Sequence, residues 1–337
     1  MKLDDCHLAF RSVVTAPFEH DEPDDEWRTA NSAGHVPSQL WDFYRATRYL
    51  SASALAGFST PTERIVTVYF ARLIRSVKAC LADAAELRDE MRDISPHQYD
   101  PTKPYSNEFD RSAARKHRSA FRSLLVNLLG ALDVIADTIA VVFPRKIPKL
   151  YAGGAAFTAV DAWLRKPHVL PPGLITPHDH FIAELHAALS PEVAVLSGPE
   201  RDWLPLMRMY RNKVAHLGHD SYMQIGLQGK RDGNIAFFIP RSWPFVAEQY
   251  ATTGPAASSP AEPVDFSDVL PDWLMHQDLE EYSEGAYRKV RAIIGRTFGV
   301  LHAAYVQLKA VPASTETLAD LERNSQAYQF EFFRDAG

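Results

Sequence analysis

The stretch LLVNLLGALDVIADTIAVVF, residues 124–143, decides the fold class of this chain. Its apolar run approaches the length of a membrane span, but Asn127, Asp133 and Asp137 interrupt it. Polar side chains at these positions favour a helix buried in a bundle over a helix surrounded by lipid. We therefore expect a long helix over 107–143 in a mainly α-helical protein that does not enter a membrane.

Apolar residues recur at helical spacing on both sides of this stretch. Thr60-Pro61-Thr62-Glu63 is typical of a helix start, and the pattern predicts a helix from there to about Arg92. Further helices are expected at 38–56, 155–166, 179–189, 197–217 and 278–310. Between the last two, at about 222–240, the period changes and two short strands around KRDGN predict a β-hairpin.

These elements predict an all-α fold, an antiparallel multi-helix bundle with one inserted β-hairpin. The bundle is expected to form one domain over 36–310. An irregular acidic arm, 1–35, precedes it, and a short helical tail, 311–337, follows it. The low-complexity segment ATTGPAASSPAEP, 251–263, is expected to form a mobile loop.

The composition excludes some classes of protein. The 337 residues are 46% hydrophobic, enough for a substantial core, and the net charge is -6. This charge argues against a chain that coats nucleic acid with a general positive surface, but it allows a small basic cleft. The two cysteines, Cys6 and Cys80, lie far apart without metal-like spacing, and the N-terminus lacks a signal-peptide pattern. We therefore expect a cytoplasmic protein.

The segment RMYRNKVAHLGHD, 208–220, carries the strongest chemical signal in the chain. It places Arg211, Asn212 and His216 at the end of a predicted helix, just before Gly218. The guanidinium of an arginine suits phosphate oxygens, and a histidine exchanges protons near neutral pH. An asparagine amide can orient either of them. This set is sufficient to cleave RNA through attack by its own 2′-hydroxyl, without a metal.

The spacing within the motif favours a site shared by two copies of the chain. In an ideal helix Arg211 and His216 point about 140° apart. Asn212 and His216 share a face, and Arg208 falls near it. A two-fold dimer that joins two such helix ends would bring two histidines and two arginines into one groove.

RNKVAH, 211–216, resembles the Arg-x4–6-His motif of the HEPN superfamily in its Arg-Asn-x-x-x-His form. The resemblance implies an all-helical bundle, often dimeric, and a metal-independent endoribonuclease of the kind found among toxins and phage-defence effectors. It also implies that Arg211 and His216 are catalytic and that Asn212 supports them. The expected partners are an RNA substrate, a second copy and an antitoxin or regulator, with no cofactor or metal. Candidate RNA contacts are Arg208, Lys213, Lys230 and Arg231.

Two other interpretations remain open. In a non-catalytic scaffold, Arg211 would pair with a surface carboxylate and His216 would cap its helix end. In a metal-dependent phosphohydrolase of HD type, a cluster of histidines and aspartates would bind the ion. Its candidate ligands are His178, Asp179, His180, His186, His216, His219 and Asp220. Asp179 is also a candidate N-cap of its helix.

A basic stripe lies on the first half of the helix expected at 107–143. Arg111, Arg115, Arg118 and Arg122 recur at three- and four-residue steps and therefore share one helix face. The stripe could line a path for RNA, but a solvated face that pairs with acidic neighbours is the favoured explanation.

Overall fold

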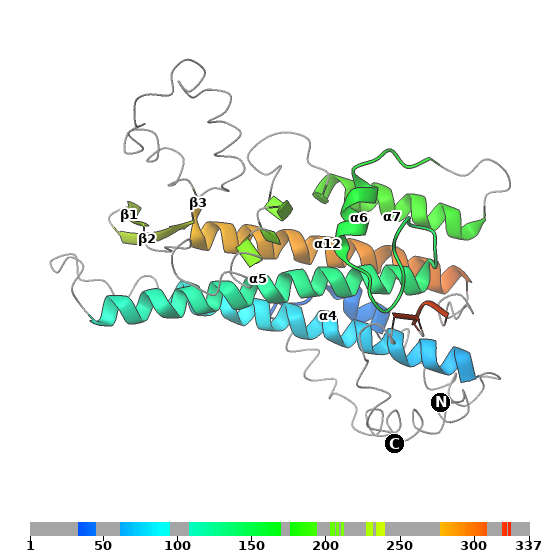
Figure 1. Ribbon diagram of the computed structural model, residues 1–337, viewed down its shortest axis with the longest axis horizontal. Coiled ribbons are helices and arrows are strands. Elements are labelled where there is room, and N and C mark those ends of the chain that lie inside the picture. The colour runs from blue at the N-terminus through cyan, green and yellow to red at the C-terminus, as the bar shows by residue number, and fades with distance from the viewer. Residues whose placement is uncertain are drawn as a thin grey trace, which may run out of the picture. The chain divides into compact units, whose positions relative to one another are not determined.

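A computed structural model gives the structure of the protein, which is mainly α-helical in the residues it describes (Figure 1). These residues are 33–44, 61–94, 108–169, 176–193, 203–205, 207, 208, 210, 211, 227–231, 234–239, 277–308, 319–321, 323 and 324. The helices are α4 (Pro61–Ile94), α5 (Glu108–Val142), α6 (Phe157–Leu164), α7 (Pro177–Val193) and α12 (Leu279–Leu308). Residues 38–44 and the described parts of 203–211 and 319–324 are also helical.

The three longest helices confirm the periodicity of the sequence. α4, α5 and α12 begin and end within two residues of their expected bounds. The shorter helices differ more, because few apolar repeats define them. α6 is shorter than the expected 155–166. α7 begins two residues before the expected 179 and continues to Val193, past Pro191.

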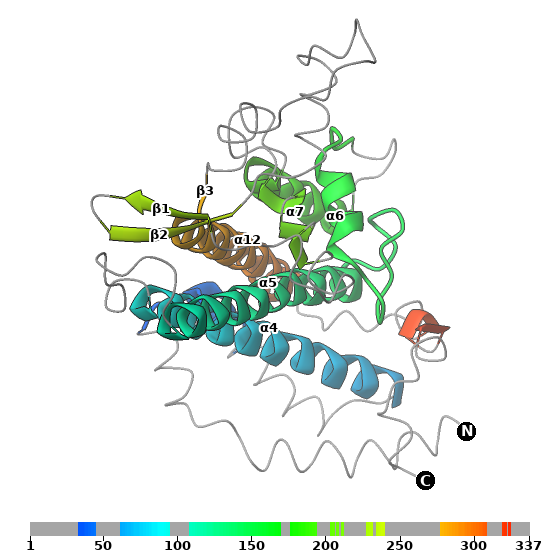
Figure 2. The same cartoon turned by 60° about the vertical axis from the view of Figure 1, so that its left-hand side comes forward.

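The described residues also include three paired strands (Figure 2). β1 (Leu227–Arg231) runs antiparallel to β2 (Asn234–Ile239), and the short strand β3 (Gln277–Asp278) pairs with the other edge of β2. β3 leads directly into α12 and was not expected, since two residues are too few for a periodic pattern. Asp232 and Gly233 lie outside the described residues, so a hairpin inserted into a helical bundle remains a prediction.

The chain divides into two compact units, and the three long helices each contribute residues to both. Unit 1 comprises 1–82, 130–201 and 289–337, and unit 2 comprises 83–129 and 202–288. The expected single bundle domain over 36–310 remains a prediction. The arm, the loop at 251–263 and most of the tail lie outside the described residues.

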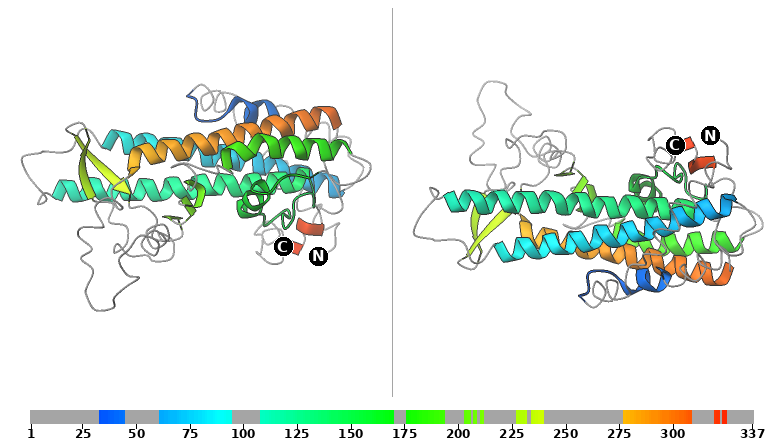
Figure 3. Two further views of the ribbon diagram at one scale, coloured as in Figure 1. Left: turned by 90° about the horizontal axis from the view of Figure 1, so that it is seen from above. Right: turned by 90° about the horizontal axis from the view of Figure 1, so that it is seen from below.

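Unit 1 has an aromatic core. The ring centroid of Phe43 lies 5.5 Å from that of Phe70 on α4 and 5.3 Å from that of Phe298 on α12. In the same unit α7 lies beside α12 (Figure 3), where Arg296 forms an ion pair of 2.6 Å with Glu192. These edge-to-face and tilted ring contacts and this ion pair hold together elements that are far apart in sequence.

The two aspartates that interrupt the apolar stretch are hydrogen-bonded within unit 1. The Oδ1 atom of Asp137 accepts hydrogen bonds from the backbone N–H groups of Gly153 (2.8 Å) and Ala155 (3.2 Å). Its Oδ2 atom accepts one from the Tyr69 hydroxyl (3.1 Å), and Oδ1 of Asp133 accepts one from the Phe157 N–H (2.9 Å). Burial raises the pKa of Asp137 to about 6. These aspartates therefore hold the segment that leads into α6.

One segment, Ser119–Val142 of α5, is long and apolar enough to span a membrane by length and composition, with a mean hydropathy of 1.9. Of this window, 67% is buried inside the protein. The core helix of a water-soluble protein passes the same test, and the hydrogen-bonded Asp133 and Asp137 favour that explanation.

Candidate functional site

The helix that carries the start of the RNKVAH motif lies in unit 2; its described residues are 203–205, 207, 208, 210 and 211. We call these residues the motif helix. Its buried side chains follow helical spacing: Trp203, Leu204, Met207 and Tyr210. Arg208 and Arg211, three residues apart, are both half-buried. The motif helix is thus amphipathic, and both arginines lie outside the buried set.

An aromatic cluster anchors the motif helix in unit 2. The ring centroids of Phe121 on α5, Tyr210 and Tyr282 on α12 lie 6.0–6.1 Å from one another, in edge-to-face arrangements. The Tyr282 hydroxyl also donates a hydrogen bond of 3.4 Å to the Trp203 carbonyl oxygen. Burial raises the pKa of both tyrosines, so they stay protonated at neutral pH. We call Phe121, Tyr210 and Tyr282 the aromatic anchor.

The structure places only part of the predicted site. Arg211 follows the anchored Tyr210 directly and is the last described residue of the motif helix. Asn212, Lys213 and His216 lie outside the described residues, so the approach of Arg211 to His216 remains a prediction. Lys230 and Arg231 belong to β1, for which the backbone alone is described.

The described part of the basic stripe on α5 is accessible to solvent. Arg122, the member of the stripe whose side chain is described, is exposed, in agreement with a solvated helix face, and the nearby Lys116 is exposed as well. His117 between them points inward and is fully buried. Burial lowers the pKa of His117 to about 4, so this histidine is neutral at pH 7.

In the alternative metal site, Asp179 is held by other groups. Its carboxylate accepts hydrogen bonds from the Lys146 ammonium (2.8 Å) and from the Thr176 N–H (2.9 Å). The Asp179 N–H in turn donates to the Thr176 hydroxyl oxygen (3.3 Å). This reciprocal pair is a capping box, with Thr176 as the N-cap. The expectation of Asp179 as the N-cap was therefore wrong, because α7 begins two residues earlier.

The described histidines of that alternative site do not gather around Asp179. His178 packs edge-on against Phe143, and His180 is exposed. His186 lies 2.9 Å from the Lys166 carbonyl oxygen through Nε2 and 3.2 Å from the Ser190 hydroxyl through Nδ1. Within the described ranges no three His, Cys, Asp or Glu side chains are placed to hold a metal ion. His216, His219 and Asp220 lie outside those ranges.

Replacing Asp179 with asparagine is expected to lower the Tm of the protein at neutral pH and to lower it less in acid. The bonds from Lys146 and Thr176 hold the pKa of Asp179 well below its usual value of 3.8. Its stabilisation is therefore present above about pH 4 and is lost as the pH falls toward the folded-state pKa. Thermal melts from pH 7 downward should show a difference in Tm that narrows below about pH 4.

The matched control for that experiment is Glu184→Gln, which removes an exposed carboxylate from the same helix. It should change the Tm little at any pH. A constant difference in Tm between Asp179→Asn and the wild type across the range would contradict the assignment of this pH dependence to Asp179.

No family model matches this chain, and no curated protein or solved structure matches it either. The HEPN resemblance therefore depends on residues 211–216 and on the helix that carries Arg211. Sequence reasoning missed the role of Tyr282, which anchors the motif helix from a position 72 residues beyond Tyr210. A periodic pattern does not indicate which residues of two helices contact each other. The sequence does, however, place Tyr282 near the start of the helix expected at 278–310.

Proposed function

We propose that the protein is a metal-independent endoribonuclease of HEPN type. The observation that carries this proposal is the position of Arg211 in the motif helix. The helix is held through Tyr210 by the aromatic anchor, and Arg211 follows Tyr210 directly. Packing of Tyr210 fixes the backbone from which Arg211 extends, and a defined starting position favours an arginine that recognises phosphate. The mainly helical structure also supports the proposal, because the resemblance of the RNKVAH motif implies a helical bundle.

The proposed reaction needs only groups of this chain and of RNA. His216 removes the proton of a 2′-hydroxyl, and that oxygen attacks the adjacent phosphorus. The bond from phosphorus to the 5′-oxygen breaks, and a histidinium returns a proton to the leaving oxygen. Arg211 stabilises the charge on the phosphorane, and Asn212 orients the reacting groups. The products are a 2′,3′-cyclic phosphate and a 5′-hydroxyl.

The proposal includes a dimer. The separation of about 140° between Arg211 and His216 on one helix suits a groove built from two motif helices. Arg208, Lys213, Lys230 and Arg231 are the proposed RNA contacts.

The finer architecture proposed is an antiparallel HEPN-type bundle with an inserted hairpin. The proposed setting is the cytoplasm, as a toxin or phage-defence effector with an antitoxin or regulator.

Incubation of the wild-type protein with RNA in excess EDTA tests the proposal. We expect cleavage under these conditions, and the upstream fragments should end in a 2′,3′-cyclic phosphate. Mass spectrometry of the fragments, or failure of a poly(A) polymerase to extend their 3′ ends because no free 3′-hydroxyl is present, identifies the product.

Two results would contradict the proposal. Absence of cleavage of tRNA, rRNA and mRNA by pure folded protein would favour the non-catalytic scaffold. Cleavage that appears only after a divalent metal is added would favour the histidine–aspartate alternative, in which His216, His219 and Asp220 take part.

A further inference from the structure

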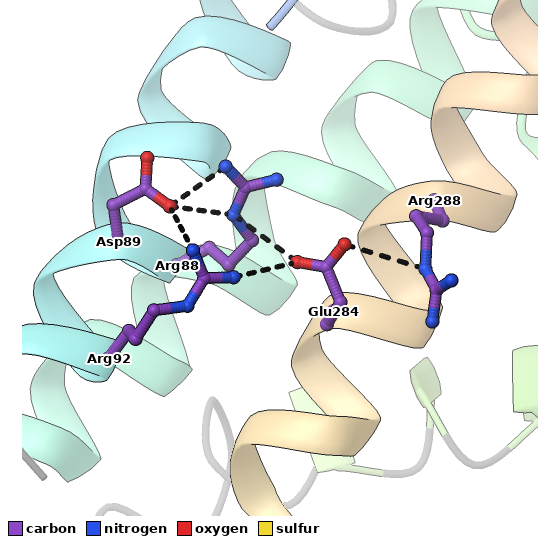
Figure 4. Close-up of polar contacts among 5 residues, drawn as sticks. All are labelled: Arg88, Asp89, Arg92, Glu284 and Arg288. Atoms are coloured by element: carbon purple, nitrogen blue, oxygen red, sulfur yellow. Dashed lines mark hydrogen bonds and ion pairs between the residues drawn. The ribbon is translucent and has the colours of Figure 1, made fainter. Parts of the chain in front are cut away.

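Five charged side chains of α4 and α12 form one network in unit 2 (Figure 4). Its members are Arg88, Asp89, Arg92, Glu284 and Arg288. Three guanidinium groups surround the carboxylate of Glu284, at 3.5 Å for Arg88, 3.3 Å for Arg92 and 3.4 Å for Arg288. Asp89 contacts two of the arginines, at 2.8 Å for Arg88 and 3.7 Å for Arg92. We call this network the arginine cluster.

The arginine cluster has one more positive charge than negative charge. Its three arginines differ in exposure: the side chain of Arg88 is 16% exposed, whereas those of Arg92 and Arg288 are 58% and 70% exposed. Arg88 also lies over the ring of Tyr287, with its central carbon 4.5 Å from the ring centroid. Arg88 is therefore held in place by its surroundings, whereas Arg92 and Arg288 present positive charge to solvent.

A link between α4 and α12 explains only part of this arrangement. Arg88 and Glu284 alone would join the two helices, and exposed ion pairs add little stability. Arg288 contacts Glu284 only through Nε, and its two terminal nitrogens point away from the carboxylate in Figure 4. A guanidinium in this orientation still offers donors to a second anion. Convergence of several arginines on one set of oxygen atoms also suits a phosphate group.

We propose that the arginine cluster binds the phosphodiester backbone of single-stranded RNA. Arg92 and Arg288 make the phosphate contacts, and Arg88 supports them. Glu284 keeps the guanidinium groups together and competes with phosphate for them. This assignment rests on the proposed ribonuclease function for the identity of the polyanion. It adds an RNA-binding surface, formed by α4 and α12, to the contacts expected from the motif itself.

Fluorescence anisotropy with a labelled 2′-O-methyl oligouridylate tests the proposal, because this probe cannot be cleaved through its 2′-oxygen. The double variant Arg92→Gln/Arg288→Gln is expected to bind about tenfold more weakly. Its plot of log affinity against log salt should be shallower by about 1.4, as expected for two lost phosphate contacts on a single strand. Glu284→Gln is expected to bind about threefold more tightly, because a competing charge is gone.

The control variant is Arg296→Gln/Arg323→Gln. It removes the same charge from two arginines of unit 1 that are 47% and 66% exposed and also pair with carboxylates. Thermal melts establish that every variant is folded. Equal weakening of binding in the cluster variant and in the control would overturn the proposal, because it would indicate net charge alone. Unchanged or weaker binding by Glu284→Gln would overturn the competing role of this carboxylate.

Failure of this inference can be distinguished from failure of the proposed function. If the wild type cleaves RNA in EDTA but the cluster variant binds the probe normally, the inference is wrong and the function stands. If the wild type does not cleave but the cluster variant binds more weakly than the control variant, the RNA-binding surface stands and the nuclease proposal falls.

Discussion

Replacement of His216 by alanine is expected to lower the rate of RNA cleavage by about 10²–10⁴-fold, the usual contribution of a general base or acid. Replacement of Arg211 by alanine should lower it by about 10²–10³-fold, because the phosphorane loses a charged donor. Initial rates in EDTA, with protein in excess over RNA, measure the chemical step without the effect of product release. Both variants should keep the wild-type far-ultraviolet circular dichroism.

Two further variants sharpen this test. His180→Ala removes an exposed histidine of α7 and should cleave at the wild-type rate. Arg211→Lys keeps the charge but loses the planar pair of donors, so its rate should lie between those of the wild type and Arg211→Ala. Wild-type rates for folded His216→Ala or Arg211→Ala would exclude that residue from catalysis. Thermal melts of the Arg211 variants accompany the rate measurements, because Arg211 follows the packed Tyr210 and a loss of folded protein would also lower the rate.

Phe121→Ala is expected to lower the free energy of unfolding by about 3–5 kcal/mol, the typical cost of deleting a buried phenylalanine ring. Phe121 is fully buried and contacts both other rings of the aromatic anchor. Tyr210 would lose an edge-to-face partner, and a cavity would open beside the motif helix. Urea denaturation followed by circular dichroism measures the change.

Val126→Ala is the matched control on the same helix. Val126 is 51% exposed, so its truncation should change the free energy of unfolding by about 0.5 kcal/mol or less. A loss below about 1 kcal/mol for Phe121→Ala would show that the ring contributes little to packing in unit 2. If the anchor positions the motif, the folded fraction of Phe121→Ala should also cleave RNA more slowly than the wild type.

The sequence by itself determined the long helices. Apolar residues recur every three or four positions over more than 30 residues in α4 and α5, and this local pattern is sufficient to define a helix and its buried face. It also predicted that Arg211 belongs to a helix with a buried face, which the structure confirms up to Arg211 itself. The step from Arg211 to His216 remains a prediction of the motif.

The tertiary structure alone decided which polar and aromatic side chains meet. His178 and His180 flank Asp179 in the sequence. The Asp179 carboxylate nevertheless bonds to Lys146, 33 residues away, and to Thr176, the N-cap of its own helix. Tyr282 reaches Tyr210 across 72 residues, and Glu284 reaches Arg88 across 196. Such pairs follow from how folded elements approach one another. Periodicity reports which face of a helix is buried, but it carries no information about what lies opposite that face.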